Sequence, residues 1–252
     1  SMGERVKILA GLLDGSIDGV VLSCESFLAR YPEKERFIDA TITFRKNCEI
    51  KTSDLAERLL YAGYKRDTDV KTPATFRLSG DVLEIFPPAS FCPYRVDFFG
   101  DAVEKIRVYE PETHVASEEK DALTVLPASD VLVRQNEVNG ILNSIRNAAR
   151  TLAPEMRGAA SDAMERFTRN PSDALNGFIL PFLKEQTAPF LTYAKNFTLV
   201  VDDVRQIEDK LKLTRKAFEN RAETLSEGGK AFGCHKEAIF TESGALAPRG
   251  EI

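Results

Sequence analysis

The sequence lacks the signatures of several large classes of protein. No apolar run in its 252 residues approaches the ~20 residues that a membrane-spanning helix needs. The N-terminal residues show no pattern of a basic end, an apolar run and a small-residue cleavage site, which a secretory signal would have. We therefore expect a cytoplasmic protein without membrane contact.

Potential metal ligands are few and badly spaced. The four cysteines lie far apart, at Cys24, Cys48, Cys92 and Cys234. Without a secretory signal these cysteines are expected to be reduced thiols. The two histidines are His114 and His235, and only His235 adjoins a cysteine. Because neighbours in sequence rarely share a metal, the sequence predicts no metal site.

A nucleotide-binding loop is also missing. The sequence contains no G-x-x-x-x-G-K-[ST] motif, whose backbone amides and lysine hold phosphates in many ATPases. The stretch TLVVDD (198–203) resembles the acid-ended strand that binds magnesium beside such a loop, but it has no loop to work with. We expect Asp202 and Asp203 to cap the following helix. No pair of nucleophile and base stands out, so we expect no catalytic residue and no cofactor.

What is present fits a globular protein with one large or two moderate domains. Hydrophobic residues make up 43% and charged residues 29%, which are ordinary proportions. The net charge of −5 argues against strong binding of nucleic-acid phosphates by the chain as a whole. A binding role would therefore depend on a local patch of basic side chains.

The two ends of the chain have an α/β pattern. Apolar residues at helical spacing predict a helix over 4–13, and continuous apolar runs predict buried strands at 19–24 and 197–203. Several further helices are expected between 130 and 252. We predict one α/β domain, part of a RecA-like fold, formed by 1–32 and 130–252 and interrupted by an inserted antiparallel α+β module at 33–129.

The inserted module has the pattern of a sheet with one helix packed against it. A helix is expected over 53–63, with Ser53 as N-cap and Gly63 at its end. Alternating segments predict a strand near Tyr64 and strands over 39–47, 75–78, 81–86, 94–99, 102–109 and 122–126.

The stretch TFRLSGDVLEIFPP (75–88) predicts a hairpin with a turn at Ser79-Gly80. One face carries apolar residues, whereas the other places Arg77 beside Val82 and Phe86. Arg77 has two interpretations. It forms an ordinary cross-strand ion pair with Glu84, or it belongs to a protein-binding surface, where arginine beside apolar groups is common.

A resemblance favours the second interpretation. Residues 63–113 resemble a module shared by the excision-repair protein UvrB and the transcription-repair coupling factors, and the resemblance is carried by GYKR (63–66), FRLSGDVLEIFP (76–87) and YRVDFF (94–99). In that family the module is an insert in a split RecA-like domain and docks UvrA. The resemblance implies UvrA-contacting positions at Arg66, Arg77 and Ser79, with Lys65 adjoining. Ser79 departs from the family pattern, which usually has arginine before that glycine.

The segment NGFILPFLKEQTAPFLTYAKNFTLVVDD (176–203) resembles the transcription-repair coupling factors rather than UvrB. We therefore expect a non-catalytic, UvrB-like N-terminal module that recruits UvrA in transcription-coupled repair. The resemblance implies that ATP, magnesium, DNA and RNA polymerase are bound by other domains of the parent protein, including its C-terminal motor. The alternatives are a piece of UvrB acting in ATP-dependent damage verification, and a DNA-binding module.

Overall fold

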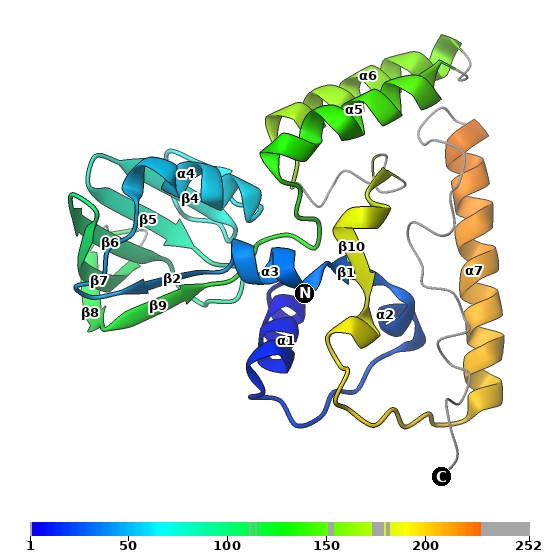
Figure 1. Cartoon of the computed structure of the whole chain (residues 1–252), viewed down its shortest axis with the longest axis horizontal. Helices are drawn as coiled ribbons and strands as arrows, with labels where there is room; N and C mark the ends of the chain where they lie inside the picture. The colour runs from blue at the N-terminus through cyan, green and yellow to red at the C-terminus, as the bar shows by residue number, and fades with distance from the viewer. Residues whose placement is uncertain are drawn as a thin grey trace. The chain divides into compact units, whose positions relative to one another are not determined.

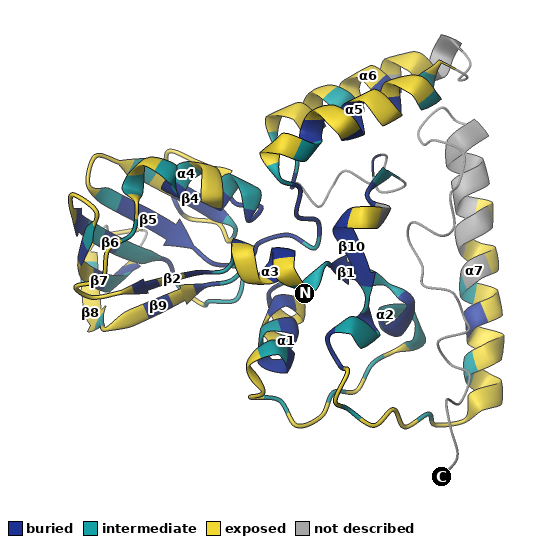
Figure 2. Ribbon diagram, viewed as in Figure 1, coloured by how far each residue is buried: buried dark blue, intermediate teal, exposed yellow. Residues whose placement is uncertain are grey.

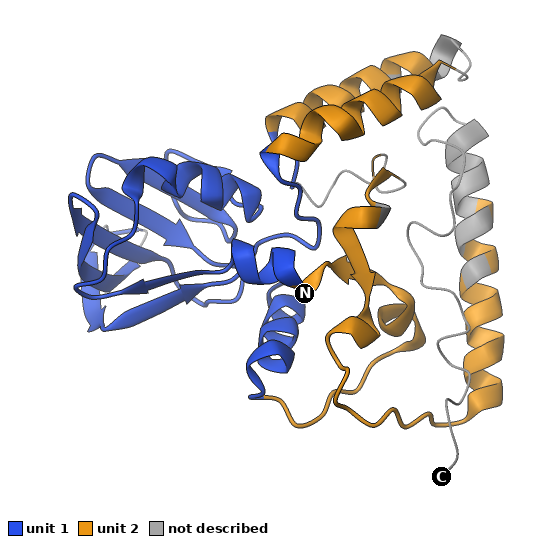
Figure 3. Cartoon of the chain, in the orientation of Figure 1, with its two compact units in different colours: residues 1–16, 35–135, 170–174 blue, residues 17–34, 136–169, 175–252 orange. Residues whose placement is uncertain are grey.

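The chain is a mixed α/β protein made of two compact units (Figures 1 and 3). The computed structural model describes residues 2–110, 112–113, 115–150, 154–172, 179 and 182–227. Unit 1 comprises 1–16, 35–135 and 170–174, and unit 2 comprises 17–34, 136–169 and 175–252. These two units are defined by how the chain packs in space. The predicted division into 1–32, 33–129 and 130–252 stays a prediction.

Unit 1 is built around a six-stranded sheet with the strand order β3-β4-β5-β6-β7-β8. Its strands are β3 (Lys65–Arg66), β4 (Thr75–Ser79), β5 (Val82–Phe86), β6 (Tyr94–Phe99), β7 (Ala102–Glu110) and β8 (Val115–Lys120). All neighbours are antiparallel except β3 and β4, which run parallel. The sheet is therefore mixed, whereas an antiparallel one was predicted. Sequence reasoning also missed β8.

A second, two-stranded sheet and a helix complete the core of this unit. Strands β2 (Ile42–Arg45) and β9 (Ala122–Val125) pair antiparallel, and α4 (Thr52–Tyr61) follows β2 in the chain. Phe44 of β2 meets Phe98 of β6 edge to face, with ring centroids 6.2 Å apart. Fully buried side chains of these elements form one cluster, which includes Phe44, Leu55, Leu59, Tyr64, Phe76, Leu83, Ile85, Val96 and Ile106 (Figure 2).

The start of α4 is capped from another part of the sheet. Thr52 donates both its backbone N–H and its hydroxyl to Asp101 Oδ1, each at 2.8 Å. Asp101 lies in the turn between β6 and β7, and its carboxylate satisfies a donor that the helix itself leaves unpaired. The prediction that Ser53 is the N-cap is therefore wrong, since Ser53 lies one residue inside the helix.

The remaining helices of unit 1 are α1 (Met2–Asp14) and most of α3 (Lys34–Ala40). The predicted helical spacing of α1 is confirmed, because Val6, Leu9 and Leu12 are all buried. Arg5 of this helix forms an ion pair with Asp130.

Unit 2 consists of helices and one short sheet. Its elements are α2 (Cys24–Leu28), β1 (Arg30–Pro32), nearly all of α5 (Gln135–Ala149), α6 (Pro154–Arg169), η2 (Lys184–Gln186), β10 (Thr187–Pro189), η3 (Phe190–Thr192) and α7 (Val204–Glu227). Strands β1 and β10 pair antiparallel, and Arg30 Nε donates to the hydroxyl of Thr187 at 2.7 Å. None of the described helices combines the length and the apolarity that a membrane crossing requires.

Two predicted strands of unit 2 are wrong. Residues 19–24 and 197–203 form no strand, and Val21 and Val200 are 99% and 85% exposed. A buried strand needs hydrogen-bonded neighbours, and among the described residues none pairs with either segment. The predicted cap is confirmed at Asp203, whose Oδ1 accepts the N–H of Gln206 at 3.1 Å at the start of α7.

We expect Gly63→Ala to destabilise unit 1 strongly. Gly63 ends α4 with φ +89°, and a Cβ at this position would lie 2.5 Å from Cβ of the buried Ser129. An L-residue is strained there, so we expect a loss of about 2 kcal/mol or more in the free energy of unfolding. Gly140→Ala is the control, because this glycine is exposed within α5 and the new methyl group meets nothing within 4 Å. Urea unfolding should show that the control is as stable as the parent or slightly more so. Equal stability of the two variants would contradict this account.

Candidate functional site

The predicted site residues lie at one edge of the six-stranded sheet. Lys65 and Arg66 make up β3, the edge strand, and both are exposed. Gly63 and Tyr64 lead into β3, and the Tyr64 side chain is fully buried with its hydroxyl donating to the Leu126 carbonyl at 2.7 Å. This anchored residue fixes the point at which the chain joins the sheet edge.

The adjoining hairpin has the predicted faces but a different register. Ser79 pairs with Val82, so the turn is Gly80-Asp81 rather than Ser79-Gly80, with φ +56° at Gly80. Each pairing is shifted by two residues, and a shift of two keeps every side chain on its predicted face. Phe76, Leu83 and Ile85 are accordingly buried in the core, and Arg77 stands opposite Glu84 on the other face.

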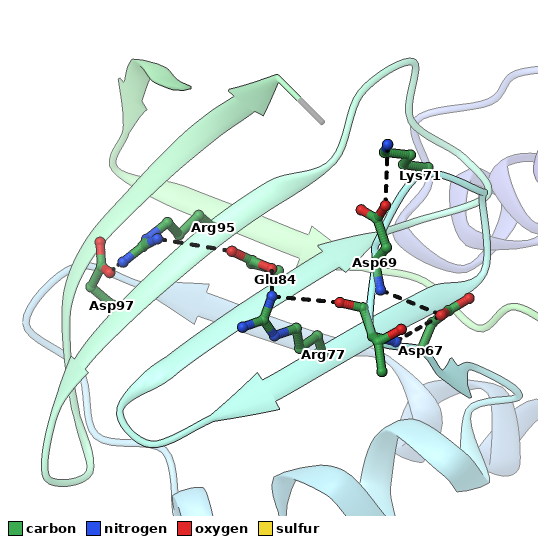
Figure 4. Close-up of polar contacts among 8 residues, drawn as sticks. Asp67, Asp69, Lys71, Arg77, Glu84, Arg95 and Asp97 are labelled. Carbon is green, nitrogen blue, oxygen red and sulfur yellow. Dashed lines mark hydrogen bonds and ion pairs between the residues drawn. The ribbon is translucent and has the colours of Figure 1, made fainter. Parts of the chain in front are cut away.

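Arg77 has two polar partners on the outer face of the hairpin. Its Nη1 lies 3.7 Å from Glu84 Oε2, and it donates to the Thr68 carbonyl at 3.5 Å (Figure 4). The predicted cross-strand pair with Glu84 is therefore present. The Arg77 side chain nevertheless stays 45% exposed, whereas that of Glu84 is only 10% exposed. Arg77 therefore remains accessible to a partner, while the nearly buried carboxylate of Glu84 balances its positive charge.

Charges of alternating sign continue across this face of the sheet (Figure 4). Glu84 Oε1 lies 3.8 Å from Arg95 Nη1, and Arg95 Nε donates to Asp97 Oδ1 at 3.0 Å. Arg107 on β7 forms a further ion pair with Asp97. Burial raises the pKa of Asp97, but the bonds from Arg107 and Arg95 outweigh it, so the pKa lies below its ordinary value. The outer face therefore carries a row of paired charges that ends at Arg77.

Arg66 and Lys65 point to opposite faces of the sheet edge. Lys65 pairs with Thr75 and Arg66 pairs with Phe76, so each shares a face with its partner. Lys65 is thus on the face of Arg77, whereas Arg66 is on the face of the core. The Arg66 guanidinium lies over the Phe76 ring, 5.8 Å from its centroid, in a cation–π contact.

An open groove of about 590 Å³ lies between these residues, and its lining is Arg66, Asp67, Thr68, Arg77, Leu78 and Ser79. The structure therefore brings together three of the four predicted site residues, whereas Lys65 adjoins the groove without lining it. Sequence reasoning missed Asp67 and Thr68. Asp67 Oδ1 accepts the N–H groups of Thr68 at 2.7 Å and Asp69 at 3.4 Å, which is the Asx-turn geometry typical of aspartate in loops.

The chemistry of the groove is that of recognition by charge and hydrogen bonding. Its side chains include two guanidinium groups, which can bind carboxylates with two parallel bonds, and the exposed hydroxyl of Ser79. Within the part of the chain that the structure describes, no three His, Cys, Asp or Glu side chains are placed to hold a metal ion. His114, Cys234 and His235 lie outside the described residues.

Comparison with known proteins assigns the segment that contains this groove. Residues 42–130 match the family described as the UvrB interaction domain. The predicted resemblance is thereby confirmed.

Similarity to individual proteins extends beyond this domain. The chain is 24% identical to the transcription-repair-coupling factor of Bacillus subtilis over 237 residues, which cover 90% of this chain and 20% of that protein. It is 22% identical to the transcription-repair-coupling factor of Staphylococcus epidermidis over 240 residues, which cover 92% of this chain and 20% of that protein. It is also 27% identical to UvrABC system protein B of Cytophaga hutchinsonii over 143 residues, covering 57% and 21%. The chain therefore spans about a fifth of the length of these relatives.

We expect Asp97→Asn to lower stability at neutral pH but not at acidic pH. The variant loses the charged bonds to Arg95 and Arg107, which should reduce the free energy of unfolding by about 1 kcal/mol at pH 7. Since the folded-state pKa of Asp97 is below 3.8, its contribution is complete above the unfolded pKa and is lost as the pH falls through the folded value. Urea unfolding at pH 7, 5 and 3 should show the difference from the parent shrinking below about pH 4. Asp81→Asn, in the exposed hairpin turn, is the control for loss of one charge. A difference that is the same at all three pH values would show that the pairing is not the cause.

Proposed function

We propose that the groove beside β3 and β4 docks UvrA, and that the chain is the UvrB-like module through which a transcription-repair coupling factor recruits UvrA in nucleotide excision repair. The observation that carries the proposal is the meeting of Arg66, Arg77 and Ser79 in one groove inside the segment that matches the UvrB interaction domain. These are the positions that the family resemblance implies for UvrA contact.

The surroundings of the arginines suit them to binding acidic groups. Arg77 is held by Glu84 and the Thr68 carbonyl, and Arg66 by the Phe76 ring. A side chain that is already positioned loses less conformational entropy when a partner binds. Both residues are exposed, so carboxylates of UvrA can reach them without rearrangement of the sheet.

The extent of similarity favours a coupling factor over UvrB. Alignments with the coupling factors run along 90–92% of this chain, whereas those with UvrABC system protein B cover 52–60%. Turnover of ATP by this chain would favour the UvrB alternative. Salt-sensitive binding to bare duplex DNA would favour a DNA-binding module.

The remainder of the proposal concerns the parent protein. We propose that this chain is non-catalytic and works through its surface, with no cofactor of its own. ATP and magnesium would serve the motor of the parent protein, and RNA polymerase and DNA would be bound by other domains. The interrupted RecA-like arrangement of the flanking segments belongs to the same proposal, because the similarity to coupling factors includes those segments.

Replacing both groove arginines should abolish docking without unfolding the chain. We expect Arg66→Ala/Arg77→Ala to weaken UvrA binding at least ~30-fold, since truncation of one hot-spot arginine costs about 2 kcal/mol. Calorimetric titration of UvrA with the purified chain measures the effect. The melting temperature should change little, because Glu84 keeps Arg95 as a partner when Arg77 is lost.

The matched control removes two arginines from the same unit outside the groove. Arg45 of β2 and Arg58 of α4 are exposed and do not line the groove. Arg45→Ala/Arg58→Ala has the same net charge as the test variant and should bind UvrA as the parent does. If the test variant also bound as the parent does, the groove would not be the docking site.

Adding an arginine at Ser79 should strengthen docking. Ser79 is exposed at the end of β4 and lines the groove, so the longer side chain has room and brings a further cation to the partner. We expect Ser79→Arg to increase the affinity for UvrA roughly 3- to 10-fold, the range for one additional charged contact. Ser79→Gln, which adds length without charge, is the control. An affinity unchanged or lowered by arginine would show that UvrA presents no acid at this position.

A further inference from the structure

The edge strand β3 covers only part of its neighbour. Strand β4 runs over five residues, Thr75–Ser79, but β3 pairs only with Thr75 and Phe76. Beyond these pairs the chain leaves the sheet through the turn at Asp67. The second half of β4, residues 77–79, therefore forms an open sheet edge, and it is this half that lines the groove.

The backbone of Leu78 faces this open edge. The N–H of Asp67 donates to the Phe76 carbonyl at 2.9 Å, so Phe76 turns its carbonyl towards β3, and the even-numbered residues of β4 face this edge. Odd-numbered residues turn theirs towards β5, because bonding alternates along a strand. Leu78 is the next even-numbered residue. Among the described residues its N–H and carbonyl have no protein partner, because the pairing of β3 with β4 ends at Arg66 and Phe76.

The basic side chains around this edge lie on both faces of the sheet. Arg77 and Lys65 lie on the outer face, whereas Arg66 lies on the core face. A partner that contacts both arginines must therefore pass along the edge itself. An extended chain does so naturally, because its successive side chains point to opposite faces. A helix laid against either face would reach only one of the arginines.

We propose that UvrA docks by adding an extended segment to this edge, continuing the line of β3 alongside residues 77–79 of β4. The Leu78 N–H and carbonyl bond the backbone of that segment, and acidic side chains of the segment, on alternate sides, pair with Arg77 and Arg66. This mode is β-strand addition, in which the backbone gives affinity and the flanking side chains give specificity. The inference rests on the proposed docking of UvrA and adds the form in which UvrA is recognised.

The charges of the groove are compatible with an acidic segment. Of the described residues that line the groove, only Asp67 is acidic, and its Oδ1 already accepts two backbone N–H groups. Glu84 lies below Arg77 and is almost buried, so it presents little negative charge to a partner at the edge. Two exposed arginines, Arg66 and Arg77, thus line the groove against the one carboxylate of Asp67 among the described residues of the lining.

Hydrogen exchange at single residues tests the mode of docking. The amide of Leu78 should exchange rapidly in the free chain and at least ~10-fold more slowly when UvrA saturates it, because it then donates to the added segment. The outward amides of β8, at the opposite edge of the sheet, are the internal control and should be unchanged. An unchanged rate at Leu78 in a saturated complex would overturn strand addition while leaving UvrA docking intact. Failure of UvrA to bind the chain at all would overturn both.

A pair of substitutions at Leu78 gives a second test. Leu78→Pro removes the N–H and places a ring at the edge, and proline is tolerated on edge strands. Leu78→Ala retains the N–H but loses the half-buried side chain. We expect proline to weaken UvrA binding at least ~10-fold and alanine less than ~3-fold. Circular dichroism of each free variant reports whether the sheet persists. If the proline variant is unfolded, hydrogen exchange at Leu78 in the native chain decides whether UvrA docks by strand addition. Folded variants with equal affinities would overturn the proposal.

Discussion

The site depends on one buried anchor, the Gly63-Tyr64 junction at the end of α4. Strand β3 has only two residues, too few to hold a place in a sheet by hydrogen bonds alone. Its position is set instead by the buried Tyr64 ring, the bond from its hydroxyl to Leu126, and the close approach of Gly63 to Ser129. Burial also raises the pKa of the Tyr64 hydroxyl well above its usual range, so the group stays a neutral donor. The anchor fixes where β3 begins, and the turn at Asp67 ends the strand two residues later, so the open edge of β4 starts beyond Phe76.

The charge row on the outer face explains how Arg77 is both held and available. A nearly buried carboxylate such as Glu84 needs positive neighbours, and it has Arg77 and Arg95 at 3.7 and 3.8 Å. These separations are ion-pair distances, and Glu84 Oε2 accepts no hydrogen bond from the residues that the structure describes. Glu84 therefore orients Arg77 by charge without occupying its donors. The guanidinium can then form short, charge-assisted bonds with a partner.

The sequence predicted side-chain faces better than exact pairings. The hairpin turn was placed one residue early, since Ser79-Gly80 and Gly80-Asp81 both offer a glycine for positive φ, but the resulting shift of two preserved both faces. Strand β8 was missed because its Glu118 and Glu119 are typical of solvated loops, although charged residues also protect edge strands. The apolar runs at 19–24 and 197–203 led to wrong strand predictions, because strand formation depends on neighbouring strands that a local pattern does not reveal.

The basic site residues were predicted from the family resemblance. Asp67 and Thr68 belong to the site only because the Asx turn brings them to the groove.

The face of the sheet on which Ser79 lies determines where an arginine at this position would add positive charge. Ser79 shares the outer face with Arg77, two residues apart on β4, so an arginine there would extend the cationic line of that face. With serine, the outer face offers Arg77 and Lys65, and the core face offers Arg66. Charge is then distributed across the edge rather than concentrated on one face. In the proposed strand addition, binding would therefore draw more on contacts in the plane of the sheet, and the backbone of Leu78 is the group that faces this plane at the open edge.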